Sequence, residues 1–298
     1  MPLDAPVTTM TLFASDTAGS ASTRDANDHA AAYAIEREAY PHMFHIGDAL
    51  AKVIANRFPK QFSGLETAYS AAGTLRVTLD RLLAEHYFLA AEAMRSGVSG
   101  AADLEAGKAA IGANSTDLQA VVRAAYGAKA AAAFRTLWDG HITAYVGYIS
   151  AARGNDVAGK ANATAQVNVY AGQLAGFFAG ANPYLDAGAL TTMFQQHAGH
   201  LIGQVDAFAS ADYTRTYQLV RTGYSHMFMA GEALALGIAT QKPKQFPDHA
   251  RLPDTATEDR PQVGESSSFG PTGTAGAMLA FGLLVGLSVV ALGRRRPR

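Results

Sequence analysis

The chain has 298 residues, of which 49% are hydrophobic and only 16% are charged, with a formal net charge of −1 at pH 7. Because no basic excess is present to neutralise phosphates, we expect no nucleic-acid partner. The chain contains no cysteine, which excludes disulfides, thiol catalysis and cysteine-ligated zinc or iron–sulfur sites.

The pattern along the chain predicts a helical domain between two polar segments. Residues 1–27 are rich in Ser, Thr, Asp and Ala without apolar periodicity, so we expect a disordered N-terminal segment. From 28 to 241 apolar residues recur at spacings of three and four and Ala is abundant, which predicts an all-α helical-bundle domain. Short Gly-, Asn-, Asp- or Pro-containing breaks divide it into helices at 28–57, 74–96, 101–126, 129–153, 156–180, 187–210 and 212–240.

The first and last of these helices carry nearly the same sequence. Residues 40–62 read YPHMFHIGDALAKVIANRFPKQF and residues 224–246 read YSHMFMAGEALALGIATQKPKQF, with no gap between matched positions. Upstream of these segments, Tyr33 matches Tyr217 and Arg37 matches Arg221. We therefore interpret 28–62 as resembling the last helix of a preceding module, and 74–241 as one complete module.

A second repeat lies inside that module. The segments LLAEHYFLAAEAM, LWDGHITAYVGYI and MFQQHAGHLIGQV place His86, His141 and His197 at equivalent positions. Each segment is followed by a partner helix, and Asp156 and Asp212 occupy matching turns. The pattern predicts a bundle of αα-hairpins of about 55 residues, used three times.

The C-terminal part of the chain predicts a membrane anchor. Residues 242–273 contain five prolines among polar residues and are expected to form a linker. An uncharged apolar stretch, AGAMLAFGLLVGLSVVALG, predicts a transmembrane helix over 274–293. The basic tail RRRPR at 294–298 is expected in the cytoplasm, so the bulk of this single-pass cell-membrane protein lies outside the cell. A GxxxG motif in the apolar stretch favours self-association.

Histidine, methionine and carboxylate side chains on facing helices are the ligand types of a metal site in a bundle. Methionine beside histidine favours copper over iron, and the chain has no Glu-x-x-His pair of the kind that di-iron sites use. Glu85 and Asp139 also stand beside or near two of the histidines. The candidate ligands are His86, His141, His197, His200, His226, Met229 and Glu232, with a weaker set of His42, His45 and Asp48 on the first helix.

Two other interpretations of these residues remain open. The histidines are also suited to hydrogen bonding inside the core of a structural or protein-interaction module of the cell envelope, without metal. A haem or redox bundle with two facing histidine ligands is the third alternative. No nucleophile, P-loop or dinucleotide motif stands in a suitable strand–turn–helix context, so we expect binding rather than turnover.

The segments LLAEHYFLAAEAM, LWDGHITAYVGY and DYTRTYQLVRTGYSHMFMAGEALALGIATQKPKQF resemble a family of helical extracytoplasmic proteins of Gram-positive bacteria. The resemblance covers about 28–246. Some members of that family are fused to a copper amine oxidase N-terminal-like domain. The resemblance thus implies an all-helical extracytoplasmic protein with an association with copper, and it implies no defined catalytic residues.

Overall fold

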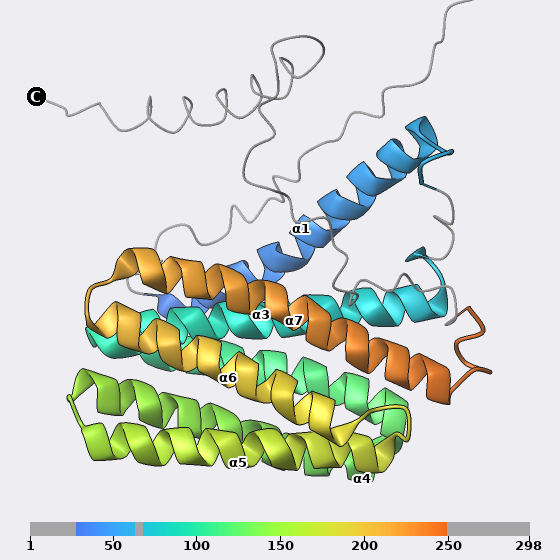
Figure 1. Ribbon diagram of the computed structural model, residues 1–298. Helices are drawn as coiled ribbons and strands as arrows, with labels where there is room; N and C mark the ends of the chain where they lie inside the picture. The colour runs from blue at the N-terminus through green and yellow to red at the C-terminus, as the bar shows by residue number, and fades with distance from the viewer. Residues whose placement is uncertain (1–27, 63–67, 249–298) are drawn as a thin grey trace, which may run out of the picture. The chain divides into compact units, whose positions relative to one another are not determined.

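The computed structural model describes residues 28–62 and 68–248, and within these ranges every regular element is an α-helix. The predicted all-α class is therefore confirmed, and the predicted helix boundaries differ from the observed ones by no more than three residues. The helices are α1 (His29–Arg57), α3 (Ala71–Ser99), α4 (Leu104–Arg153), α5 (Val157–Ala181), α6 (Ala187–Ala209) and α7 (Tyr213–Gln241) (Figure 1).

The long element α4 consists of two helical segments that reverse direction at Gly127. This residue has φ 86° and ψ 174°, a conformation that only glycine adopts without strain. Nη1 of Arg135 donates a hydrogen bond to Oγ1 of Thr116 over 2.9 Å, which joins the two segments side by side. The segments 104–126 and 128–153 therefore pair as antiparallel neighbours, in agreement with the two separate helices expected there.

Side-chain caps explain why the helices begin where they do. In the matching turns before α5 and α7, Asn155 and Ala211 adopt positive φ angles of 55° and 61°. The aspartate that follows each of them then accepts a hydrogen bond from a backbone N–H of the first helical turn, which satisfies one otherwise unpaired donor. The same type of cap is made by Asp28, Ser70, Asp156, Asp186 and Asp212.

The helices from α3 to α7 share one hydrophobic core. Helix α3 packs against α4 and α7, α5 packs against α4 and α6, and α6 also packs against α7. Large side chains such as Tyr87, Phe134 and Ile149 are almost fully buried in this core. Each stabilises the fold by about 1.5–3 kcal/mol relative to an exposed position.

Helix α1 contacts the module mainly through α4 and α3, and its Tyr40 also contacts Tyr224 of α7. Nε of Arg37 donates to Oε1 of Glu85 over 2.9 Å, and Nη2 donates to Oδ2 of Asp117 over 2.6 Å. Tyr33 is buried in a small cluster with residues of α3 and α4. These contacts fix the N-terminal half of α1 on the module.

The described residues all belong to one compact unit of the chain, Met1–Ala256. Among the helices of 28–62 and 68–248, none is long and apolar enough to cross a bilayer. The predicted disordered segment 1–27, most of the predicted linker 242–273, the predicted membrane helix 274–293 and the tail 294–298 lie outside the described residues.

Candidate metal centre

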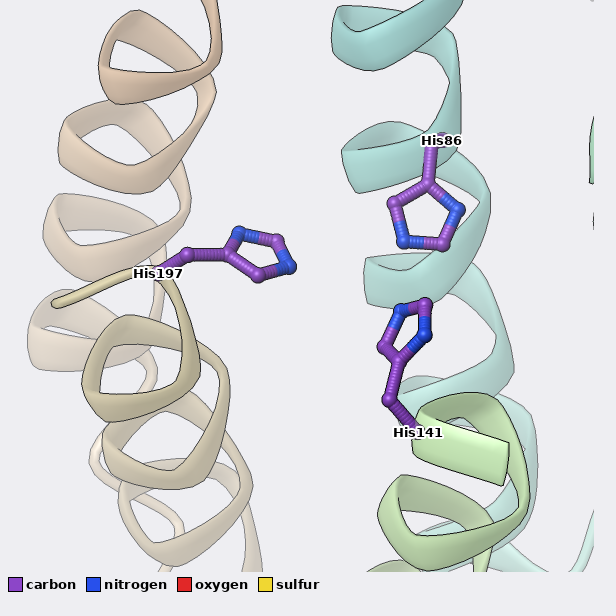
Figure 2. A group of neighbouring side chains, drawn as sticks. All are labelled: His86, His141 and His197. Carbon is purple, nitrogen blue, oxygen red and sulfur yellow. The ribbon is translucent and has the colours of Figure 1, made fainter. Parts of the chain in front are cut away.

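Three histidines from three different helices converge inside the bundle (Figure 2). His86 belongs to α3, His141 to the second segment of α4 and His197 to α6. One ring nitrogen from each lies within 4.8 Å of the other two. The ring centroid of His86 lies 5.5 Å from that of His141 and 6.0 Å from that of His197. These are the three histidines that occupy equivalent positions in the sequence repeat.

The centre lies beside an apolar cavity of about 70 Å³. His141 and His197 both line this cavity, and the described residues that line it include no Asp or Glu. The ring centroid of Trp138 lies 4.8 Å from that of His86 and 4.5 Å from that of His141. The three imidazoles therefore sit in surroundings of low polarity, where an unpaired polar atom is costly.

Each of the three imidazoles has an unsatisfied nitrogen. The Nδ1 atoms of His86, His141 and His197 are buried and have no hydrogen-bond partner. Buried polar atoms are paired in the great majority of cases, and leaving one unpaired costs about 1–3 kcal/mol. Because no protein group holds these Nδ1 atoms, the tautomer of each ring is not fixed, and each imidazole can turn a free lone pair toward the point where the three rings converge.

The electrostatics of the cluster keep all three rings neutral at pH 7. Burial, reinforced by the neighbouring His141, lowers the pKa of His86 from 6.5 to about 3. Burial also lowers the pKa of His141 to about 4, although the backbone of Trp138 and the charge of Asp139 act in the opposite direction. The pKa of His197 falls well below 6.5 because of burial and the neighbouring histidines. Neutral imidazole is the form that ligates metal ions.

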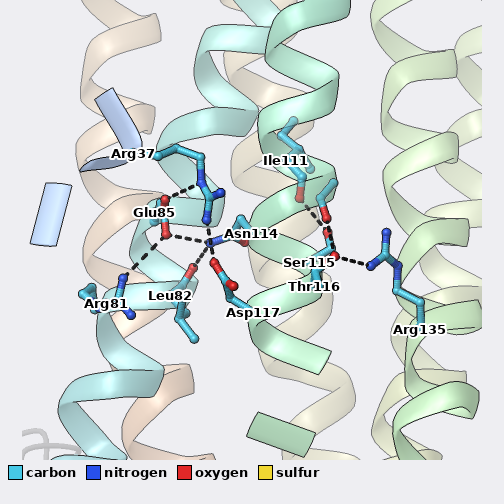
Figure 3. Close-up of polar contacts among 11 residues, drawn as sticks. Arg37, Arg81, Leu82, Glu85, Ile111, Asn114, Ser115, Thr116, Asp117 and Arg135 are labelled. Carbon is cyan, nitrogen blue, oxygen red and sulfur yellow. Dashed lines mark hydrogen bonds and ion pairs between the residues drawn. The ribbon is translucent and has the colours of Figure 1, made fainter. Parts of the chain in front are cut away.

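The carboxylate next to His86 belongs to a different network (Figure 3). Adjacent residues on a helix point about 100° apart, so Glu85 and His86 face different neighbours. Glu85 is 1% exposed. It accepts hydrogen bonds from Nε of Arg37 over 2.9 Å and from Nδ2 of Asn114 over 3.0 Å, and Arg81 lies 3.9 Å away. Glu85 therefore holds α1 on the module and is no part of the histidine cluster.

His226 and His200 lie near the centre without joining the three-histidine group. Their ring centroids are 5.6 Å apart, and His226 lines the same cavity. Nε2 of His226 lies 3.0 Å from the carbonyl oxygen of Met193, so this ring donates its Nε2 proton to the backbone. Both histidines contribute to the lowered pKa of His197. They are neighbours of the cluster, each with its own environment.

The structure separates the α7 residues that the sequence analysis grouped together. A step of three residues advances a helix by about 300°, so successive steps drift backward by about 60°. His226 lies at the edge of α7 that faces α6, where it contacts Met193. Glu232 lies at the opposite edge, where it forms an ion pair of 3.2 Å with Arg76 of α3. Met229 lies between them and is 47% exposed, so neither Met229 nor Glu232 is a ligand of the histidine cluster.

The weaker candidate set lies on the exposed part of α1. His42, His45 and Asp48 are all exposed, and the ring centroids of the two histidines are 6.1 Å apart. In residues 28–62 and 68–248, the three-histidine cluster is the one group of at least three His, Asp or Glu side chains with the spacing of a metal site.

Two methionines near the centre were missed by the sequence analysis. Met227 is 4% exposed, and both Met227 and Met193 line the cavity that His141 and His197 also line. Met227 directly follows His226. To choose Met227 rather than Met229 as the residue near the centre, one has to know which side of α7 faces the cavity, and the sequence does not give this. A thioether is thus available near the histidines, from residues other than the predicted one.

Comparisons of the chain with family models, with curated proteins and with solved structures found no match. The resemblance to extracytoplasmic helical proteins, and the association with copper that it implies, therefore stay predictions. The function has to be inferred from the chemistry of the three histidines.

Proposed function

We propose that the helical bundle binds a transition-metal ion through His86, His141 and His197, and that monovalent copper is the ion this site fits best. One observation carries the proposal. Three histidines on three helices, His86 buried and His141 and His197 partly buried, bring their ligand atoms within 4.8 Å of one another, and each keeps a buried Nδ1 atom without a hydrogen-bond partner. Imidazole is a good ligand for copper, zinc, iron and nickel.

The spacing supports ion binding after a small adjustment of the rings. For an equilateral triangle with sides of 4.8 Å, the centre lies roughly 2.8 Å from each corner. A metal–imidazole bond is about 2.0–2.1 Å long, so each nitrogen has to move by less than about 1 Å. Rotation about the side-chain bonds supplies a movement of this size without shifting the helices.

The surroundings favour a monovalent ion. All three ligands are neutral, and the described residues around the cavity include no carboxylate that would compensate a second positive charge. The cost of burying an ion rises with the square of its charge, so a divalent ion costs about four times as much as a monovalent one before ligation. The thioethers of Met193 and Met227, which line the cavity, also suit the soft cuprous ion.

The proposed role is holding or buffering copper, since the sequence carries no motif for turnover and the three imidazoles are suited as ligands. We place this module, with its three repeated αα-hairpins, outside the cell membrane and anchored through 274–293, as the sequence predicts. Copper bound there would be kept apart from the solvent at the cell envelope. In the alternative role, a structural module without metal, the same histidines would serve as core side chains.

The single tryptophan of the chain provides the test, because Trp138 contacts two of the three ligands. The full chain is titrated anaerobically with Cu(I) in the presence of a competing chelator, while Trp138 fluorescence and elemental analysis report occupancy. We expect one copper per chain with a saturable fluorescence change, and the loss of both when all three histidines are replaced by leucine. Replacing the exposed His42 and His45 by alanine is the matched control and should leave binding unchanged. A folded parent that retains no copper would refute the proposal.

A further inference from the structure

Helices α1 and α7 share their sequence but bury different faces. In α7, Met227, Leu234 and Ile238 are 4–5% exposed in the core between α3 and α6. The matched residues of α1 are Met43, Leu50 and Ile54, which are 66%, 57% and 45% exposed. The apolar face that holds α7 in its module is therefore present on α1 and uncovered there.

The N-terminal halves of the two helices show the reverse. Tyr33 of α1 is 7% exposed, whereas the matched Tyr217 of α7 is 61% exposed. Arg37 forms ion pairs with Glu85 and Asp117, whereas the matched Arg221 is exposed. The two helices of matching sequence thus pack on the same module through different faces.

Two glycines show how closely the uncovered face of α1 follows the buried face of α7. At Gly231 of α7, an added Cβ would lie 2.9 Å from the backbone nitrogen of Asp80, so only glycine fits. The matched Gly47 has nothing within 4 Å of such a Cβ. A glycine within a helix costs about 1 kcal/mol relative to alanine, and nothing in the described residues requires one at this position of α1. Close approach of another helix, as at Gly231, explains it.

We propose that the exposed face of α1, formed by Met43, Ile46, Leu50 and Ile54, docks into the α3–α6 groove of a second module of this three-hairpin type, in the place that α7 takes in its own module. The face continues an existing contact, since the hydroxyls of Tyr40 and its repeat counterpart Tyr224 are 2.7 Å apart and the rings of Phe44 and Phe228 stack. This inference is independent of metal binding.

The polar residues of the exposed face of α1 also match those that α7 uses to contact the α3–α6 groove. Glu232 of α7 pairs with Arg76 of α3, and the matched residue of α1 is the carboxylate Asp48. The matched residue of His226, which contacts the carbonyl oxygen of Met193, is His42. In the docked state Asp48 meets the arginine that corresponds to Arg76, and α1 joins two modules by its two faces.

A tandem chain with an empty groove tests the docking. Residues 68–211 are inserted directly before Asp28 of the full chain, so that α1 follows the added α6 as α7 follows the native one. Asp28 then occupies the capping position that Asp212 has before α7. Because the chain has no cysteine, a single Leu50→Cys substitution reports exposure by its rate of reaction with a thiol reagent. The matched control is Lys52→Cys, since the position matched to Lys52 in α7, Leu236, is 42% exposed and should react in both chains.

We expect Leu50→Cys to react at least about 100-fold more slowly in the tandem chain than in the parent, since a buried side chain reacts only from opened states. Two contacts with the added groove are expected to be tight. Gly223 and Gly237 of α7 face Tyr87 and Leu185 closely, whereas the matched residues of α1 are the larger Ala39 and Val53. A second tandem chain therefore carries Ala39→Gly and Val53→Gly. Protection of Leu50→Cys in either version supports the docking, and unchanged reactivity in both overturns it.

Discussion

Replacing His86, His141 and His197 together by leucine should abolish metal binding and stabilise the metal-free bundle. The two effects are expected together because ligand sites keep polar atoms unpaired in the absence of the ion. A histidine that serves the core through hydrogen bonds stabilises the fold instead. The sign of the stability change therefore separates a metal site from a structural role.

The magnitude follows from the three unpartnered Nδ1 atoms. At the lower limit of about 1 kcal/mol for each unpaired buried polar atom, their removal stabilises the bundle by about 3 kcal/mol. A domain of this size gains about 2–4 °C in melting temperature per kcal/mol, so the increase should be about 6–12 °C. The cavity of about 70 Å³ beside His141 and His197 gives the branched leucine side chains room to adjust.

The assay is thermal unfolding of the parent and the triple variant in the presence of a chelator, followed by circular dichroism. Gln204→Leu is the control for removal of a buried polar side chain that has partners, because Nε2 of Gln204 donates to the hydroxyl of Tyr145 and its Oε1 accepts from the hydroxyl of Tyr87. This control should be destabilised by about 1–3 kcal/mol. A triple variant that is destabilised as much as the control would show that the histidines support the core, and the argument for a metal site would fail.

Two further predictions follow from the ionisable groups. Between pH 7 and pH 5 the free energy of unfolding of the metal-free chain, measured in urea, should fall by about 3 kcal/mol, because the three histidines gain protons only in the unfolded chain. This value includes an opposite contribution from Asp80, whose pKa is raised to about 7 by burial and which gains its proton more readily in the folded chain. The triple leucine variant loses the contribution of the three histidines and keeps that of Asp80, so its stability should rise relative to the parent over the same range; parallel titration curves of the two chains would contradict this. Arg37→Ala should lower the free energy of unfolding by about 2 kcal/mol and speed hydrogen exchange in α1, because the substitution removes an ion-pair partner of the buried Glu85. Arg221→Ala, at the matched exposed position, should change stability by less than about 0.5 kcal/mol, and equal effects of the two substitutions would refute the assigned role of Arg37.

The helices and the three-histidine cluster were accessible from the sequence for one physical reason. The caps and breaks of this chain are local signals, such as Ser70 and Asp186 at the start of α3 and α6, so the boundaries depend little on tertiary context. Equivalent positions of a hairpin repeat also face equivalent directions when the hairpins pack around one core. His86, His141 and His197 therefore meet, although they come from distant parts of the chain.

The rest of the site depended on information that local patterns lack. The i, i+3, i+6 spacing of His226, Met229 and Glu232 suggested one face, but α7 is enclosed by both α3 and α6, so the outer two residues contact different helices. Whether Met227 or Met229 is buried likewise depends on which face of α7 the neighbouring helices cover. Burial of Tyr33 and exposure of Tyr217 show the same limit, since matched residues of a sequence repeat differ in surroundings.

The contrast between His226 and the three-histidine cluster is the strongest argument for ligation. His226 is 7% exposed in the same core and lines the same cavity, and its Nε2 lies 3.0 Å from a backbone carbonyl oxygen. A partner for a buried imidazole is therefore readily provided by this bundle. Each ring of the cluster nevertheless keeps a buried Nδ1 atom without a hydrogen-bond partner. Other buried atoms of the described residues are unpaired as well, but the three histidines also bring their ligand atoms within 4.8 Å of one another, and this combination is the one that a bound ion would complete.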